Sequence, residues 1–272
     1  MNYFPYIGIT GFTQQNEVKA VIEGETLQCV PPDRKIMIGV LANSQTLIGM
    51  KQALPNLYPD AKVIPNIFFR HEQLFNVVCY HSDLTVAPAY YKELELITKS
   101  CGEPLNGIQL HNVWPHPNII AIYRSVFPRI KIILRIGDKA FRAVDFSGKL
   151  SAKAVAKRIA ERIIWYEDTI DAVLIDRSDG YGKQICIGLA DACLRVFHNR
   201  IPHLHASVAG GFSSDDSAIE PFRALVKHFP DISIDTESGI RNAANRLDIG
   251  QVKMYIKKVS LAIRMPDYQP AA

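Results

Sequence analysis

The stretch GIQLHNVWPHPNIIAIYRSVFPRIKIILRI, residues 107–136, contains the pattern that decides the fold. It begins with the apolar run GIQLHN (107–112) and ends with a second apolar run, KIILRI (131–136). An amphipathic segment that contains NIIAIYRSVF (118–127) lies between them. Near-continuous apolar runs of this length are typical of strands buried on both faces of a parallel sheet. We therefore predict a strand, a helix, and a second strand parallel to the first.

The same alternation continues in both directions along the chain. Further apolar, β-branched runs lie at 6–10, 35–42, 75–82, 171–176, 203–210 and 231–235, and a longer, mostly amphipathic segment follows each. The total of eight strand–helix units is the number that closes a barrel. We predict an α/β protein with a (β/α)8 TIM barrel. An open doubly wound sheet is the alternative, although no G-x-G-x-x-G motif follows any strand.

We assign residues 1–265 to one barrel domain and residues 266–272 to a C-terminal tail. Residues 55–74 hold three prolines and do not fit a minimal barrel, so we interpret them as an insertion between the second and third units. Residues 137–150 follow the fifth strand on the face where barrels keep their sites. Either segment is a candidate lid.

Composition excludes several classes of partner. The 31 basic and 27 acidic residues give a net charge of +4 without basic runs, so we expect no nucleic-acid partner. The five cysteines include no C-x-x-C pair, which favours a reducing, cytoplasmic compartment. We expect no signal peptide and no membrane span. The oligomeric state stays open, with a homodimer among the alternatives.

In a barrel of this kind the site lies at the C-terminal ends of the strands. That rule selects a set of polar and glycine residues: Thr10, Asn43, His81 with Asp83, His111 with Asn112, Arg135 with Asp138, Asp176 with Asp179, Gly210 with Gly211, and Asp235 with Ser238 and Gly239. His203 and His205 lie at the start of their strand, which is the opposite end. No histidine, cysteine or carboxylate spacing is diagnostic of a metal site, so we predict no metal and no cofactor.

The last two units carry the strongest local signal. VAGGFSSDD ends the seventh strand in Gly210 and Gly211, and SIDTESGIR leads from the eighth strand into Ser238 and Gly239. Barrels frequently bind phosphate at these two loops, where glycines let the backbone come close to an anion. We predict a phosphate site here, to which Arg241 adds a bidentate contact. The alternative is that the glycines only permit tight turns.

Four motifs resemble, in order, the signatures of phosphoribosylanthranilate isomerase, a (β/α)8 barrel enzyme of tryptophan biosynthesis. The motifs are GIQLHN, VLIDRSDGYGK, VAGGFSSDD and ISIDTESGIR, and the similarity is best over residues 107–241. The family reaction is an Amadori rearrangement of a phosphoribosyl amine, which needs a general acid and a general base. The resemblance implies that Asp176 is the acid. It also implies that Gln109 and His111 match the family's Gln-Leu-His motif.

Two family positions differ in this chain. The family's catalytic cysteine falls at Ile7, and the family's arginine after the second strand falls within residues 42–45, where no arginine is present. We therefore nominate His81 as the base, because a histidine titrates near neutral pH. We expect His111, Gln109, Arg135 and Thr10 to bind the substrate.

These observations support two functions. The first is an isomerase-like or other phosphosugar enzyme that acts on a phosphorylated, sugar-like small molecule by proton transfer through Asp176 and His81. The alternative is a non-catalytic ligand-binding or regulatory barrel.

Overall fold

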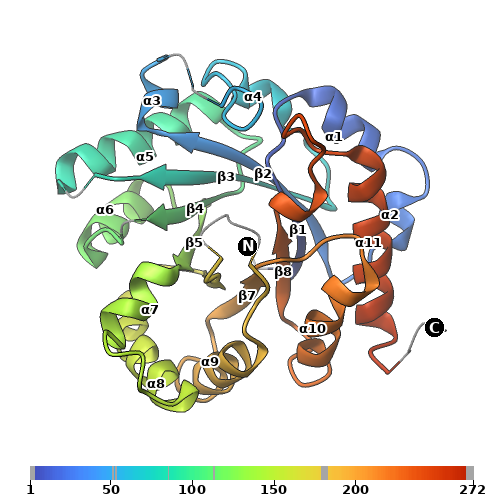
Figure 1. The fold of residues 1–272 in the computed structure, drawn as a ribbon. Coiled ribbons are helices and arrows are strands. Elements are labelled where there is room, and N and C mark those ends of the chain that lie inside the picture. The colour runs from blue at the N-terminus through green and yellow to red at the C-terminus, as the bar shows by residue number, and fades with distance from the viewer. Residues whose placement is uncertain are drawn as a thin grey trace.

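A computed structural model describes residues 4–50, 52, 54–84, 86–112, 114–178 and 183–267. Within them, eight parallel strands pair in sequence order, and the eighth pairs with the first, so the sheet is a closed barrel (Figure 1). The TIM barrel prediction is therefore confirmed, and the open sheet is excluded. None of the helices described is long and apolar enough to cross a bilayer.

The strands lie within a few residues of their predicted positions. They are β1 (Tyr6–Thr10), β2 (Lys35–Asn43), β3 (Leu74–Ser82), β4 (Gly107–Asn112), β5 (Lys131–Ile136), β6 (Ala172–Ile175), β7 (His205–Ala209) and β8 (Ser233–Thr236). Nearly every strand residue is buried, because side chains on one face fill the barrel and those on the other pack under the helices.

Helices surround the barrel (Figure 1). The α-helices are α1 (Gln15–Ile22), α2 (Thr26–Cys29), α3 (Ser44–Leu47), α4 (Ile64–Ile67), α5 (Ala87–Cys101), α6 (Pro117–Val126), α7 (Asp138–Val144), α8 (Ala152–Ile163), α9 (Ile187–Arg200), α10 (Asp216–Val226) and α11 (Ile249–Arg264). Two 3-10 helices, η1 (Ile164–Tyr166) and η2 (Ser238–Ile240), complete the set. The second unit differs from the rest, because the described residues between β2 and β3 form only the four-residue helices α3 and α4.

Two separate apolar cores show which way each strand residue points. Tyr6, Met37 and Cys79 belong to the core inside the barrel, whereas Ile7 and Ile9 belong to the core between the barrel and the helices. Residues 6, 8 and 10 of β1 therefore face inward, and residues 7 and 9 face the helices. The Ile7 side chain points away from the barrel mouth.

The connection between β2 and β3 reaches across the mouth of the barrel. Leu57 and Tyr58 pack against the inner core. Asn56 donates a hydrogen bond to the carbonyl of Ala244 at 3.0 Å and accepts one from Nε of Arg246 at 3.2 Å. The insertion predicted at residues 55–74 therefore joins the third strand's side of the mouth to the loop that follows β8.

Candidate active site

The side chains predicted at the strand ends converge on the barrel mouth. Thr10, His81, His111, Arg135 and Asp176 come from β1, β3, β4, β5 and the end of β6, and each lines one or both of two adjoining cavities. Four of them are buried, and His81 is half-buried. The barrel thus brings together residues that lie more than 160 positions apart in the chain.

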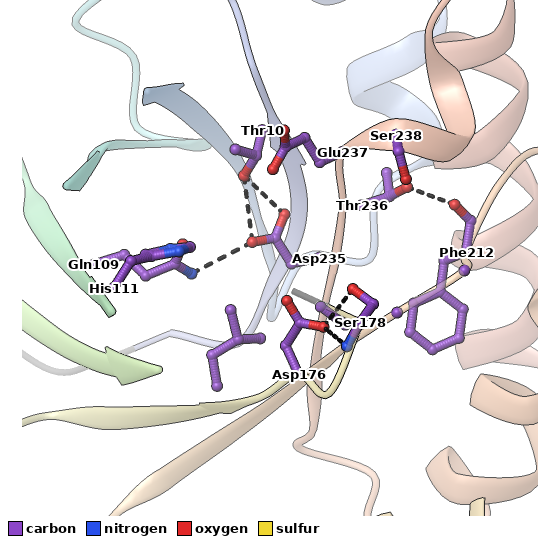
Figure 2. Close-up of a pocket in the computed structure, with 14 residues that line it drawn as sticks. Thr10, Gln109, His111, Asp176, Ser178, Phe212, Asp235, Thr236, Glu237 and Ser238 are labelled. Atoms are coloured by element: carbon purple, nitrogen blue, oxygen red, sulfur yellow. Dashed lines mark hydrogen bonds between the residues drawn. The ribbon is translucent and has the colours of Figure 1, made fainter. Parts of the chain in front are cut away.

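Asp235 lies in a niche formed by two glycines. A Cβ atom on Gly8 would lie 2.9 Å from Oδ1 of Asp235, and one on Gly39 would lie 2.6 Å from Oγ1 of Thr10. Only glycine at these positions leaves room for both side chains. The Thr10 hydroxyl donates to Oδ1 of Asp235 at 3.0 Å (Figure 2). β1 is therefore shaped to accept an acid from β8.

A chain of hydrogen bonds continues from Asp235 to β4. Nε2 of Gln109 donates to Oδ2 of Asp235 at 3.3 Å, so Oε1 of Gln109 is left to accept from Nε2 of His111 at 2.7 Å (Figure 2). This order fixes the orientation of the Gln109 amide and places a proton on Nε2 of His111. Thr10 and Gln109 both donate to Asp235, and such bonds favour its charged form.

Burial opposes those donors and raises the pKa of Asp235 from 3.8 to about 7, with smaller upward contributions from Glu237 and Asp176. Asp235 is therefore able to take up or release a proton near neutral pH. Burial also lowers the pKa of His81 to about 4, assisted by Arg135. The pKa of His111 is lowered for the same reasons, with His81 contributing.

Asp176 is held by four hydrogen bonds, all of which it accepts. Oδ2 receives Nε and Nη2 of Arg135 at 3.0 and 2.8 Å, and Oδ1 receives the amide and hydroxyl of Ser178 at 2.8 and 2.6 Å. Arg135 and Asp176 form a buried ion pair. Because every partner is a donor, the site holds this side chain as an oriented carboxylate.

His81 lies farther out. Its Nδ1 atom is 3.2 Å from the Tyr58 hydroxyl, and its ring stacks on His111 with centroids 4.2 Å apart. Its Nε2 atom is buried without a hydrogen-bond partner among the described residues. At neutral pH both rings are uncharged, which removes the repulsion that two stacked imidazolium rings would have.

The residues predicted to bind phosphate fall into two groups. Gly210 and Gly211, with φ values of 122° and 70°, line the smaller cavity together with Ser238. Gly239 and Arg241 do not line it. A Cβ on Gly239 would collide with the carbonyl of Phe212, so this glycine allows the loops after β7 and β8 to touch.

The side chain of Arg241 is buried beside β1. Gly11, at φ 112°, leaves the space that its guanidinium occupies, and Nη1 donates to the carbonyl of Asn245 at 2.9 Å. Nη2 lies 4.0 Å from Oε1 of Glu237. Burial raises the pKa of Glu237, and the charge of Arg241 opposes that rise.

The two cavities adjoin each other at the mouth. The smaller, about 40 Å³ in volume, is enough for about three water-sized groups. The larger encloses about 740 Å³, which is within the range of small-molecule sites. His111, Asp176 and Glu237 line both. One ligand can therefore occupy both cavities.

Sequence reasoning did not assign every residue of this site. It placed Asp235 at a strand end but gave it no chemical role, and it did not single out Gly8, Tyr58 or Trp114. The sequence feature that could have indicated this role is Gly8, because a glycine inside a strand marks a place where another group approaches the backbone closely. The loop at Asp179–Gly182 lies outside the described residues. Within those residues no three histidine, cysteine or carboxylate side chains are grouped to hold a metal ion.

Comparison with known proteins gives matches in structure alone. No protein-family model matches the chain, and no curated protein matches its sequence. Solved structures of TIM barrels do match. Phosphoribosylanthranilate isomerase from Thermus thermophilus has a TM-score of 0.59 at 14% identity, covering 93% of this chain and 98% of that one.

Two other solved structures show that this similarity extends to TIM barrels of different function. A phosphoribosylanthranilate isomerase in complex with reduced 1-(o-carboxyphenylamino)-1-deoxyribulose 5-phosphate has a TM-score of 0.57 at 16% identity, over 94% of this chain and 98% of its own. Active domain 2 of a Pyrococcus furiosus chitinase has a TM-score of 0.54 at 8% identity, over 99% of each chain. The chain is thus a TIM barrel similar to phosphoribosylanthranilate isomerase, as its motifs predict. The likeness at these identities concerns the fold, which also supports other chemistry.

Proposed function

We propose that the protein is an isomerase-like enzyme that transfers protons on a phosphorylated, sugar-like small molecule. The observation that carries this proposal is that the carboxyl groups of Asp176 and Asp235 line the same cavity at the barrel mouth (Figure 2). Moving a proton between neighbouring atoms of a substrate needs a group that gives a proton and takes one back. A second carboxyl group in an unlike environment can stay ionised and stabilise the charge that develops meanwhile.

Asp235 is the proposed proton carrier. Its pKa of about 7 matches the pH at which it would work, and the donors Thr10 and Gln109 stabilise its charged form after it gives up a proton. We prefer Asp235 to His81 for the proton-accepting step, because a pKa of about 4 makes His81 a weak base.

Asp176 is the proposed second group. The resemblance implies that it acts as the acid, but the four hydrogen bonds that it accepts hold it as a carboxylate. We propose that it stays ionised and stabilises positive charge that develops on the substrate. Asp235 gives its proton to one atom of the substrate and then takes a proton from the neighbouring carbon, so it ends the cycle protonated, as it began.

The phosphate of the substrate is proposed to lie against Gly210, Gly211 and Ser238. Successive positive-φ glycines let the backbone approach an anion closely. The neighbour crystallised with a 5-phosphate ligand makes such a ligand a reasonable first probe. Arg135 pairs with Asp176, and Arg241 lies near Glu237. These two cations reduce the repulsion that the two carboxylates would exert on a bound anion.

The test is solvent deuterium exchange. Incubation with aldose phosphates, ketose phosphates and amino-sugar phosphates in D₂O should introduce deuterium at the carbon next to the carbonyl or imine of at least one of them, as measured by NMR. Asp235→Asn and Asp176→Asn should each slow exchange by about 10²- to 10⁴-fold. Asp191→Asn, which alters a half-buried α9 side chain paired with the exposed Arg195, is the matched control.

Full exchange in Asp235→Asn would refute its assignment as the proton carrier. Binding of a sugar phosphate without exchange in the wild type would instead support the non-catalytic alternative. Ser238→Asp places a negative charge beside the proposed phosphate position and should weaken binding of inorganic phosphate, measured by the rise in thermal stability that it causes. Unchanged phosphate binding in this variant would contradict the phosphate assignment.

A further inference from the structure

The outer wall of the larger cavity carries two cations that have no carboxylate partner in the part of the chain that the structure describes. Lys139 of α7 and Arg162 of α8 line this cavity, and both side chains are exposed. Neither forms an ion pair with any residue in 4–178 or 183–267 that the structure describes. The adjacent acid, Asp138, instead pairs with Arg142 and Arg177. Positive charge at this end of the cavity is therefore available to a ligand.

A fixed aromatic wall lies beside these cations. The indole N–H of Trp114 donates to the carbonyl of Arg135 at 2.7 Å, and the ring contacts Tyr166 edge-on with centroids 5.7 Å apart. The guanidinium carbon of Arg162 is 5.3 Å from the centroid of the Trp114 ring. The small side chains of Ala140 and Ala143, on α7, also line this cavity. The indole thus forms a rigid apolar surface directly beside Arg162.

The same cavity also holds a buried polar atom that has no hydrogen-bond partner among the residues described. The Tyr58 hydroxyl contacts Nδ1 of His81, which places the proton of the neutral ring on Nε2 when the hydroxyl donates. That Nε2 atom has no acceptor among the described residues. A buried donor without an acceptor is costly, and a ligand oxygen would satisfy it.

We propose that the larger cavity holds a second anionic group of the ligand, a carboxylate or phosphate, bound by Lys139 and Arg162 on the β5 side of the barrel. The proposal rests on the proposed function, because it takes the reacting end of the ligand to lie beside Asp176 and Asp235. His111, Asp176 and Glu237 line both cavities, so the path between the two ends is continuous. The resemblance places anion recognition after β2, where residues 42–45 contain no arginine. The cations after β5 take over that role from a different side of the mouth.

Tryptophan fluorescence reports this subsite directly. The chain has two tryptophans, and Trp165 is 76% exposed, so Trp165→Phe leaves Trp114 as the only tryptophan, whose emission can be excited selectively at long wavelength. In this background we would titrate benzoate, phenyl phosphate and uncharged benzyl alcohol. The two anions should bind at least about tenfold more tightly than the alcohol, because a hydrogen bond between charged groups is worth that factor or more. The stronger of the two anions identifies the preferred group.

Charge-neutral variants complete the test. Lys139→Gln with Arg162→Gln should weaken binding of the anions by at least about tenfold and leave the alcohol unchanged. Lys153→Gln with Lys157→Gln removes the same charge from exposed positions of α8 outside the cavity and should change neither. Anion binding that survives the first pair, equal binding of anion and alcohol, or no response from Trp114 would each overturn the proposal. Benzoate needs no proton transfer, so its binding to Asp235→Asn separates failure here from failure of the proposed function.

Discussion

Replacement of Asp235 by asparagine tests the electrostatics on which the proposed chemistry depends. Burial raises the pKa of this carboxyl group from 3.8 to about 7 in the folded protein. At 1.36 kcal/mol per pKa unit, that rise is equivalent to about 4 kcal/mol. Below the lower value both the folded and unfolded states bind the proton. Between the two values only the folded state does, so the free energy of unfolding falls as the pH rises from about 4 to about 7.

Asparagine has nearly the shape of the carboxyl group and carries no charge. The variant therefore lacks the loss of stability that accompanies ionisation of Asp235. Near pH 4 we expect its free energy of unfolding to lie within about 1 kcal/mol of that of the wild type. Near pH 8.5 we expect it to be more stable than the wild type, by at most about 4 kcal/mol. Its side-chain carbonyl can still accept from Thr10 or Gln109, so the niche at Gly8 stays filled.

The assay is urea denaturation of both proteins at the two pH values, followed by tryptophan fluorescence. The quantity of interest is the change with pH in the stability difference between the variant and the wild type, because most other titrations cancel in it. Asp191→Asn, at an exposed ion pair, should give a difference near zero throughout. A stability difference for Asp235→Asn that stays the same at both pH values would refute the raised pKa.

Two variants and one NMR measurement test other parts of the site. Gly8→Ala places a Cβ only 2.9 Å from Oδ1 of Asp235, and we expect it to cost about 1–3 kcal/mol in urea denaturation. Gly188→Ala, whose Cβ would have no atom within 4 Å, should cost nothing, and equal effects of the two substitutions would contradict the niche. Asn56→Ala removes both hydrogen bonds to the loop after β8 and should speed amide exchange in residues 54–58, measured by mass spectrometry; unchanged exchange would mean that these bonds do not hold the segment. Burial lowers the pKa of His81 to about 4, so nitrogen NMR spectra should show its ring as neutral near pH 6. A charged His81 ring at that pH would contradict the lowered pKa.

The strands were predictable from the sequence because a strand that is buried on both faces is a near-continuous apolar run. KIILRI, for example, is a strand at the same residues that its apolar run indicates. The helical part of the second unit was less predictable. SQTLIGMKQALPNLY has apolar residues throughout, yet its helix ends at Leu47, and Gly49 adopts φ 71° two residues later. A left-handed residue ends a helix, and Pro55 prevents a new one from continuing through that point.

The site was predictable only as a set of strand ends. Thr10, His81, His111 and Asp176 were found because side chains at those ends meet at one mouth whatever their separation in sequence. Their pairing was not predictable. Asp235 acquires its pKa from burial against Gly8, and that contact exists only because β8 pairs with β1 in the register Gly8 to Asp235. The sequence of either strand alone does not indicate which residue of the other strand lies opposite Gly8 or Asp235.

The first strand shows how much this register matters for the chemistry. The resemblance places the family's catalytic cysteine at Ile7, whose side chain faces the helices, so no side chain at this position would reach the cavity. The inward neighbour is Gly8, which has no side chain, and the carboxyl group of Asp235 occupies the space that a Cβ there would need. We infer that the proton-transferring group of this barrel is supplied from β8 into a gap left by β1. The absence of cysteine at Ile7 then argues against the family's particular base without arguing against acid–base catalysis at the same place.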